Sequence, residues 1–224
     1  MNYPKLNTKQ LLTSLSLVIV TALSSCGPTA SPETPNPKIV TPLKAVFINP
    51  HKSGTYEHFK AEPGYPKTYN VYKNKNLLSA TTPSNSKVIV DIGLQRAFLM
   101  NGSQVAMDYP ISTGTSKHPT PTGNFKIMEK IVDKRSNLYG KILDADGKVV
   151  KSGADSRKDE VPEGGKFLGA AMEHWMRLTG DGIGMHKGNV PRRPASHGCI
   201  RTPGSVVPTV FEKVRTGTPV SIIK

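Results

Sequence analysis

Residues 184–201 read Gly-Met-His-Lys-Gly-Asn-Val-Pro-Arg-Arg-Pro-Ala-Ser-His-Gly-Cys-Ile-Arg, and the rest of the chain is organised around this stretch. It contains Cys199, one of two cysteines in the chain, together with the imidazoles of His186 and His197. Glycines and prolines surround these side chains and predict tight turns. A thiol beside imidazoles on tight turns is what cysteine nucleophilic catalysis requires, so the stretch is a candidate active site.

The two histidines differ in their distance from the thiol along the chain. In an extended segment His197 points to the same face as Cys199, but so near a neighbour has constrained geometry for taking the thiol proton. His186 lies further upstream, and an intervening turn can bring it opposite the thiol. This favours His186 as the base and leaves His197 a structural or oxyanion-supporting role. Zinc binding by the three side chains is an alternative that lacks a nearby acidic general base or second-shell partner.

Small and basic residues complete the candidate site. Gly198 frees the backbone, so that amide N–H groups near the thiol can point at a developing oxyanion. Ser196 is expected to brace the turn or to hydrogen-bond an imidazole. Arg192 and Arg193 fit a solvated basic turn and a contact with substrate equally well.

The remainder of the chain from residue 86 onward predicts short strands, turns and one helix. Apolar or β-branched runs bounded by turn residues predict strands at residues 87–92, 96–100, 104–111, 124–128 and 218–223. Asn101-Gly102 predicts a type I′ hairpin turn, and residues 206–214 predict a short helix. With 20 glycines and 19 prolines among 224 residues, a β-rich fold is favoured over a helical bundle.

A long polar stretch interrupts this pattern at residues 129–173. A segment of this length predicts a lid, a binding loop or a short excursion hairpin. Asp144-Ala145-Asp146-Gly147 within it predicts a turn, because a calcium loop would need ligand positions that are missing here.

The first 26 residues have the pattern of an export signal. Lys5 and Lys9 precede an apolar run that is too short for a permanent membrane span but suits a secretory signal. The ending Leu-Ser-Ser-Cys resembles the lipobox of bacterial lipoproteins, which implies that Cys26 carries lipid and begins the mature protein. The alternative is an ordinary secretory signal. Because no aspartate follows Cys26, a lipid anchor on the periplasmic side of the outer membrane is favoured if the source has two membranes.

The chain beyond the signal divides into three predicted parts. Residues 27–42 are rich in proline and predict a disordered tether. Residues 43–85 predict an N-terminal extension that packs against a main domain of residues 86–224. If Cys26 carries lipid, Cys199 has no partner for an intramolecular disulfide and is left as a free thiol.

The charge of the chain indicates an anionic partner. The formal net charge is +14, and removal of Lys5 and Lys9 with the signal leaves +12. Such a charge suits polyanions, and the export signal argues against nucleic acid and for a polymer of the cell envelope.

Several motifs, in order, resemble the L,D-transpeptidase (YkuD) catalytic domain family. Ser-His-Gly-Cys-Ile-Arg at residues 196–201, preceded by His186, is similar to the family's signature. Ser112-Thr113-Gly114, the run His-Pro-Thr-Pro-Thr-Gly-Asn-Phe at residues 118–125 and Trp175-Met176-Arg177 resemble further family motifs. The resemblance implies a mainly β fold, with β-sandwich-like mixed sheets and a short helix.

The resemblance also implies a reaction and assigns roles by motif position. Members of the family attack the carbonyl between the third and fourth residues of a peptidoglycan stem peptide and pass the acyl group to an amine, giving a 3→3 cross-link. The implied roles are Cys199 as nucleophile, His186 as base, Lys187 as the carbonyl that orients this base, Gly198 with Cys199 as oxyanion donors, and Arg201 with Ser196 as substrate-binding residues. We expect a monomer that needs no cofactor or metal.

Departures from the family pattern leave the acceptor open. The loop between His186 and Cys199 is shorter than in many members, and Lys187 and the Arg192-Arg193 pair replace smaller or neutral residues. The acyl group on Cys199 could be transferred to a stem peptide, to a protein amine or to water. Transfer to water would make the protein an L,D-carboxypeptidase or amidase. A non-catalytic wall-binding lipoprotein is a further alternative.

Overall fold

The structure is a computed structural model that describes residues 46–224. The predicted signal peptide with Cys26, the tether at residues 27–42 and the first residues of the extension lie outside the described residues. Within residues 46–224, no helix is long and apolar enough to cross a membrane.

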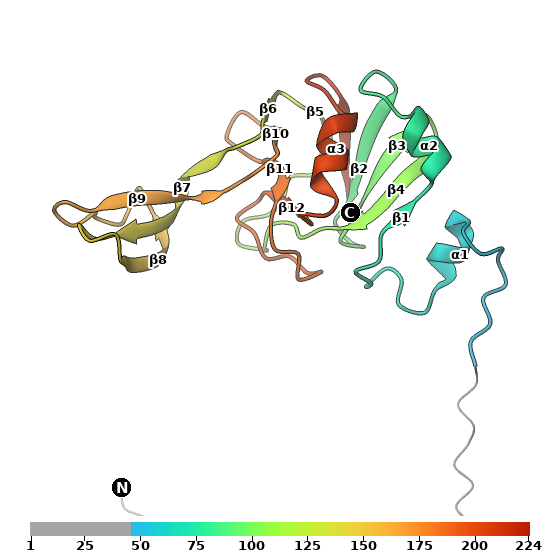
Figure 1. The fold of residues 1–224 in the computed structure, drawn as a ribbon, viewed down its shortest axis with the longest axis horizontal. Coiled ribbons are helices and arrows are strands. Elements are labelled where there is room, and N and C mark those ends of the chain that lie inside the picture. The colour runs from blue at the N-terminus through green and yellow to red at the C-terminus, as the bar shows by residue number, and fades with distance from the viewer. Residues whose placement is uncertain (1–45) are drawn as a thin grey trace, which may run out of the picture. The chain divides into compact units, whose positions relative to one another are not determined.

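Short strands dominate the described part of the chain (Figure 1). The helices are α1 (Tyr56–Ala61), α2 (Lys75–Ala80) and α3 (Val207–Lys213). The strands are β1 (Tyr72–Lys73), β2 (Ser86–Asp91), β3 (Arg96–Asn101), β4 (Gln104–Pro110), β5 (Gly123–Lys126), β6 (Glu129–Ile131), β7 (Arg135–Leu143), β8 (Val149–Asp155), β9 (Lys166–Ala171), β10 (Trp175–Arg177), β11 (Gly184–Lys187), β12 (Ile200–Thr202) and β13 (Pro219–Ile223).

Two mixed sheets share one hydrophobic core. The larger sheet has the order β1-β4-β3-β2-β13-β5, in which β13 is parallel to β2, and the second has the order β12-β11-β10-β6. Alternation along β2 buries Val88 and Val90 and exposes Lys87, as expected for a strand with one buried face. Met185 and Ile200 of the second sheet pack in the same core as these valines. The mainly β fold with mixed sheets and a short helix is therefore confirmed.

The hairpin between β3 and β4 turns one residue later than predicted. Asn101 pairs with Gln104, so the loop residues are Gly102 and Ser103. Gly102 alone has a positive φ, of 57°, which is the pattern of a type II′ turn rather than type I′. The Asn101 side chain donates to the Thr81 hydroxyl at 3.3 Å, and this contact ties Asn101 to its position in the strand.

The predicted extension at residues 43–85 supplies α1, β1 and α2. β1 pairs antiparallel with β4, with Tyr72 opposite Asp108, and so forms one edge of the larger sheet. The fully buried pair of Arg96 and Asp108 lies in this part of the sheet, and the Tyr56 hydroxyl of α1 donates to Asp108 at 2.9 Å.

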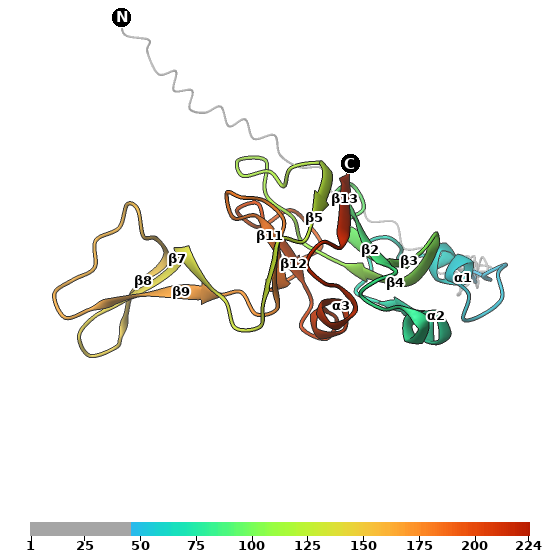
Figure 2. The same cartoon turned by 90° about the horizontal axis from the view of Figure 1, so that it is seen from above.

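Residues 129–173 contain β6 and then an antiparallel sheet with the order β8-β7-β9. The segment thus folds as an excursion of three strands, one more than the predicted hairpin has. The predicted turn at residues 144–147 is also observed, where the Gly147 N–H donates to the Asp144 carbonyl at 3.1 Å. Both views show this projecting sheet at the far side of β11 and β12 from α1 and α2 (Figures 1 and 2).

Candidate active site

Parallel pairing of β11 with β12 brings the two ends of residues 184–201 together. Met185 is paired with Ile200 and His186 with Arg201, which places Cys199 directly before β12. Residues 188–199, the β11–β12 loop, make the crossover that parallel strands require. The Cys199 thiol donates to the Gly182 carbonyl, with Sγ and O 3.8 Å apart.

His186 is buried and held in one orientation. Its Nδ1 lies 2.6 Å from the Lys187 carbonyl, so the Nδ1–H donates and Nε2 is left as the acceptor. Burial lowers the pKa of His186 to about 4, and the charge of Arg201 acts in the same direction, against the opposing Lys187 hydrogen bond. His186 is therefore a neutral imidazole near neutral pH.

The thiol is also neutral in this resting arrangement. Burial raises the pKa of Cys199, and the Gly184 N–H and the Arg201 charge oppose this effect. Among the described residues, no hydrogen bond joins Cys199 to His186. A resting thiolate–imidazolium pair is thus disfavoured, and the thiol has to lose its proton as it reacts.

Ser196 braces the turn before the thiol. Its buried hydroxyl donates to the Cys199 carbonyl and accepts from the Gly198 N–H at 3.1 Å. Both contacts are internal to the loop, as expected of a residue that braces the turn. The Gly198 N–H is likewise taken and is not a free oxyanion donor. The Cys199 N–H has no partner within residues 46–224 and remains available.

His197 lies in a stack of rings. Its ring centroid is 4.4 Å from that of Tyr139, with planes inclined by 19°, and 4.7 Å from that of His118. Burial, His118 and Arg201 together lower the pKa of His197. These contacts match the structural role expected of His197.

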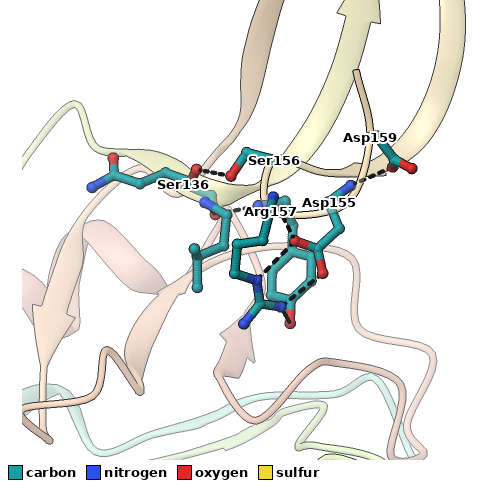
Figure 3. A network of polar contacts seen from close by, with 8 residues as sticks. Ser136, Asp155, Ser156, Arg157 and Asp159 are labelled. Carbon is teal, nitrogen blue, oxygen red and sulfur yellow. Dashed lines mark hydrogen bonds and ion pairs between the residues drawn. The ribbon is translucent and has the colours of Figure 1, made fainter. Parts of the chain in front are cut away.

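Sequence reasoning missed Tyr139, which lies on β7 of the projecting sheet. The Arg157 guanidinium lies 5.6 Å from the Tyr139 ring and donates to its hydroxyl at 3.2 Å. Figure 3 shows Arg157 turned onto the Asp155 carboxylate, with two hydrogen bonds of 2.8 and 2.7 Å. No spacing in the polar stretch distinguished Tyr139 from its neighbours.

The Ser112-Thr113-Gly114 motif lies against the β11–β12 loop. Ser112 exchanges two backbone hydrogen bonds with Arg201, at 3.0 and 2.8 Å. The Thr120 hydroxyl donates to the Gly198 carbonyl at 2.7 Å and accepts from the Gly114 N–H at 2.9 Å. The chain passes so closely here that a Cβ on Gly114 would lie 2.8 Å from the Gly198 Cα.

Arg201 is the half-buried cation of the site. Its side chain lies along Gly188, where an added Cβ would meet the Arg201 Cγ at 2.9 Å. Its charge lowers the pKa values of His186, His197 and Cys199. It has no carboxylate partner among the described residues, so its guanidinium can take one from a ligand.

The adjacent arginines differ from each other. The Arg192 guanidinium lies 4.0 Å from the Tyr69 ring centroid and donates to the Lys67 carbonyl. The half-buried Arg192 side chain is thus engaged with residues 67 and 69. The Arg193 side chain is exposed, and its carbonyl accepts from the Ser112 hydroxyl at 2.6 Å.

The described residues hold no group of three or more His, Cys, Asp or Glu side chains that could bind a metal ion. The zinc alternative requires His197 beside Cys199 and His186, but the His197 ring is instead stacked with Tyr139 and His118.

Lys187 contributes to the site through its backbone. Its amine binds Glu173 at 2.7 Å, and its carbonyl accepts from His186.

Residues 85–222 match the model of the L,D-transpeptidase catalytic domain, YkuD. The chain belongs to this family. A search of curated proteins gave no match.

Several solved L,D-transpeptidase structures each match the fold of 62% of this chain. The enzyme from Mycobacterium smegmatis is 22% identical over 59% of its own length, with a TM-score of 0.47. L,D-transpeptidase 1 from Mycobacterium tuberculosis is 22% identical over 62% of its length, with a TM-score of 0.44. A mutant of the Enterococcus faecium enzyme is 26% identical over 50% of its length, with a TM-score of 0.43. The chain thus covers less than two thirds of each of these proteins.

Proposed function

We propose that this protein is a cysteine-dependent L,D-transpeptidase that acts on peptidoglycan stem tetrapeptides and forms 3→3 cross-links. The observation that carries the proposal is the β11–β12 pairing. By its register, Cys199 faces the same side of the paired strands as a neutral His186 with a free Nε2 and an Arg201 without a carboxylate partner in the described residues. The family match over residues 85–222 supports the same reaction.

The proposed reaction has two acyl transfers. The Cys199 sulfur bonds to the carbonyl carbon between the third and fourth stem residues while its proton passes to His186 Nε2, and the Cys199 N–H donates to the oxyanion. The C–N bond then breaks, and the imidazolium returns the proton to the leaving amine. An imidazole with a pKa of about 4 is a weak base but a strong acid once protonated, which favours this second step. In the second transfer the nitrogen of an acceptor amine bonds to the thioester carbon, the C–S bond breaks, and the amine proton passes through His186 Nε2 to the Cys199 sulfur.

Substrate recognition is assigned to Arg201. A stem peptide presents carboxylates near the bond that breaks, and a guanidinium can hold one through two parallel hydrogen bonds.

The location of the protein is proposed from its sequence. The Leu-Ser-Ser-Cys ending and the positive charge support a lipid anchor on Cys26 at an anionic envelope. Palmitate labelling that is equal in wild type and Cys26→Ser would contradict this anchor.

The reaction is tested with purified mature protein and disaccharide-tetrapeptide, with products identified by mass. Cross-linked dimers that have lost one terminal residue support the proposal. Tripeptide without dimers would identify the hydrolase alternative, and no product at all would identify the non-catalytic one. Cys199→Ser and His186→Gln should abolish dimers, whereas His51→Gln, an exposed histidine outside the site, should not.

A further inference from the structure

Residues 66–70, here called the strap, lie between two arginines. Arg96 of β3 is fully buried and pairs through Nε with Asp108. Its remaining donors bind backbone carbonyls of the strap, at Pro66 (3.2 Å), Thr68 (3.1 Å) and Asn70 (3.0 Å). One side of the strap is therefore fixed to the larger sheet by a single buried guanidinium.

The intervening residues of the strap contact the β11–β12 loop instead. The Lys67 carbonyl accepts from Arg192 Nη1, and the Tyr69 ring lies 4.0 Å from the Arg192 guanidinium. The carbonyls of Pro66, Thr68 and Asn70 face Arg96 while that of Lys67 faces Arg192, so one short segment engages both arginines. The strap thus links the buried pair of the sheet to the loop that precedes Cys199.

Arg192 needs this support because of its backbone conformation. Its φ is 57°, in the left-handed region that residues with a Cβ seldom adopt. Beyond it, the Ser112 hydroxyl binds the Arg193 carbonyl, and the N–H groups of Ala195 and Ser196 donate to the Thr113 carbonyl. The second half of the loop is thereby held by residues 112–113, and the strap holds the turn at Arg192.

We propose that the strap is a positioning element for the proposed transpeptidase reaction, with Tyr69 and Arg192 as positioning residues. By fixing the turn at Arg192, the strap sets the path of the backbone that ends at Cys199. This inference rests on the proposed function for its kinetic consequence. Its structural part, the order of the β11–β12 loop, can be tested without any substrate.

The experiment compares Tyr69→Ala, Tyr69→Phe and Arg192→Ala with Lys67→Ala. Lys67→Ala is the matched control, since the exposed Lys67 side chain is removed while the carbonyl that binds Arg192 stays. The first readout is amide hydrogen exchange of residues 189–198 in the full chain. The second is kcat and KM with tetrapeptide muropeptide, and thermal unfolding checks that each variant is folded.

Tyr69→Ala and Arg192→Ala should speed exchange in residues 189–198 and lower kcat by about 10-fold or more, with a smaller change in KM. Tyr69→Phe, which keeps the ring, should restore wild-type exchange and turnover. Exchange rates equal to wild type in both alanine variants would contradict the proposed role of the strap. So would changes in exchange and kcat of the same size in Lys67→Ala. If wild type itself makes no product, the proposed function fails. The exchange measurement still tests whether the strap orders the β11–β12 loop.

Discussion

The Tyr139 ring lies against the His197 ring, with centroids 4.4 Å apart and planes inclined by 19°. Tyr139 belongs to the projecting sheet, and His197 lies two residues before Cys199. This stack is a direct side-chain contact between the excursion at residues 129–173 and the β11–β12 loop. The Arg157 guanidinium lies 5.6 Å from the Tyr139 ring centroid and donates to the Tyr139 hydroxyl, so the position of the projecting sheet and the position of the loop are coupled.

Tyr139→Ala should therefore weaken substrate binding as well as local stability. Loss of a stacked aromatic pair removes about 0.5–1.5 kcal/mol beyond the lost buried area, so a several-fold rise in KM for muropeptide is expected. Tyr139→Phe keeps the stack and should stay near wild type. Leu138→Ala, at the neighbouring exposed residue, is the control. Equal KM values in the Phe and Ala variants would contradict a role for the ring.

The pH dependence of thiol reactivity should reflect a neutral resting pair. The pKa of Cys199 is raised by burial, so the thiolate fraction should increase with pH throughout the neutral range without a plateau. His186, with its pKa lowered to about 4, stays neutral there and contributes no charge. Iodoacetamide alkylation of a Cys26→Ser chain measures this. A plateau below about pH 7 that disappears in His186→Gln would reveal a thiolate–imidazolium pair instead.

Replacing Arg201 should separate its charge from its geometry. The Arg201 charge lowers the pKa of Cys199, so Arg201→Gln should raise that pKa further and slow alkylation at about pH 8 by roughly 3–10-fold. Arg201→Lys restores the charge but not the two-pronged hydrogen bonding. It should recover alkylation while KM for muropeptide stays raised. Arg215→Gln, at an exposed arginine, should change neither, and recovery of both properties in Arg201→Lys would contradict bidentate binding.

The fold class was predictable because burial follows the local pattern of the strands. Val88 and Val90 alternate with exposed Lys87, and Gly102 lies in the predicted hairpin although the turn begins one residue later. The candidate site was predictable in part because its residues lie within residues 184–201. There, the order of His186, Cys199 and Arg201 is enough to suggest that a turn brings them together.

The remaining features depend on contacts that leave no local pattern. Backbone carbonyls of the strap bind Arg96, and a carbonyl has the same chemistry in every residue. The Gly198 N–H was expected to be free, but the neighbouring Ser196 hydroxyl binds it. Whether a hydroxyl turns inward to its own loop or outward to substrate depends on packing. Tyr139 reaches His197 only through the path of the projecting sheet.

Substitution of Gly114 tests how tightly the Ser112-Thr113-Gly114 motif packs on the β11–β12 loop. An added Cβ would lie 2.1 Å from the His118 carbonyl oxygen and 2.8 Å from the Gly198 Cα, and both are backbone atoms that cannot turn aside. Gly114→Ala should therefore destabilise the protein by about 2–4 kcal/mol, measured as a fall in thermal unfolding temperature.

The same substitution should reach the chemistry, because the backbone that has to move includes Gly198, the residue before Cys199. Displacement of a reacting group by about 1 Å can lower turnover by ~10²-fold, so a substantial loss of kcat is expected in the protein that remains folded. Gly180→Ala is the control, since no atom lies within 4 Å of its added Cβ. If Gly114→Ala had the same thermal unfolding temperature and the same kcat as Gly180→Ala, the loop would not depend on this close approach.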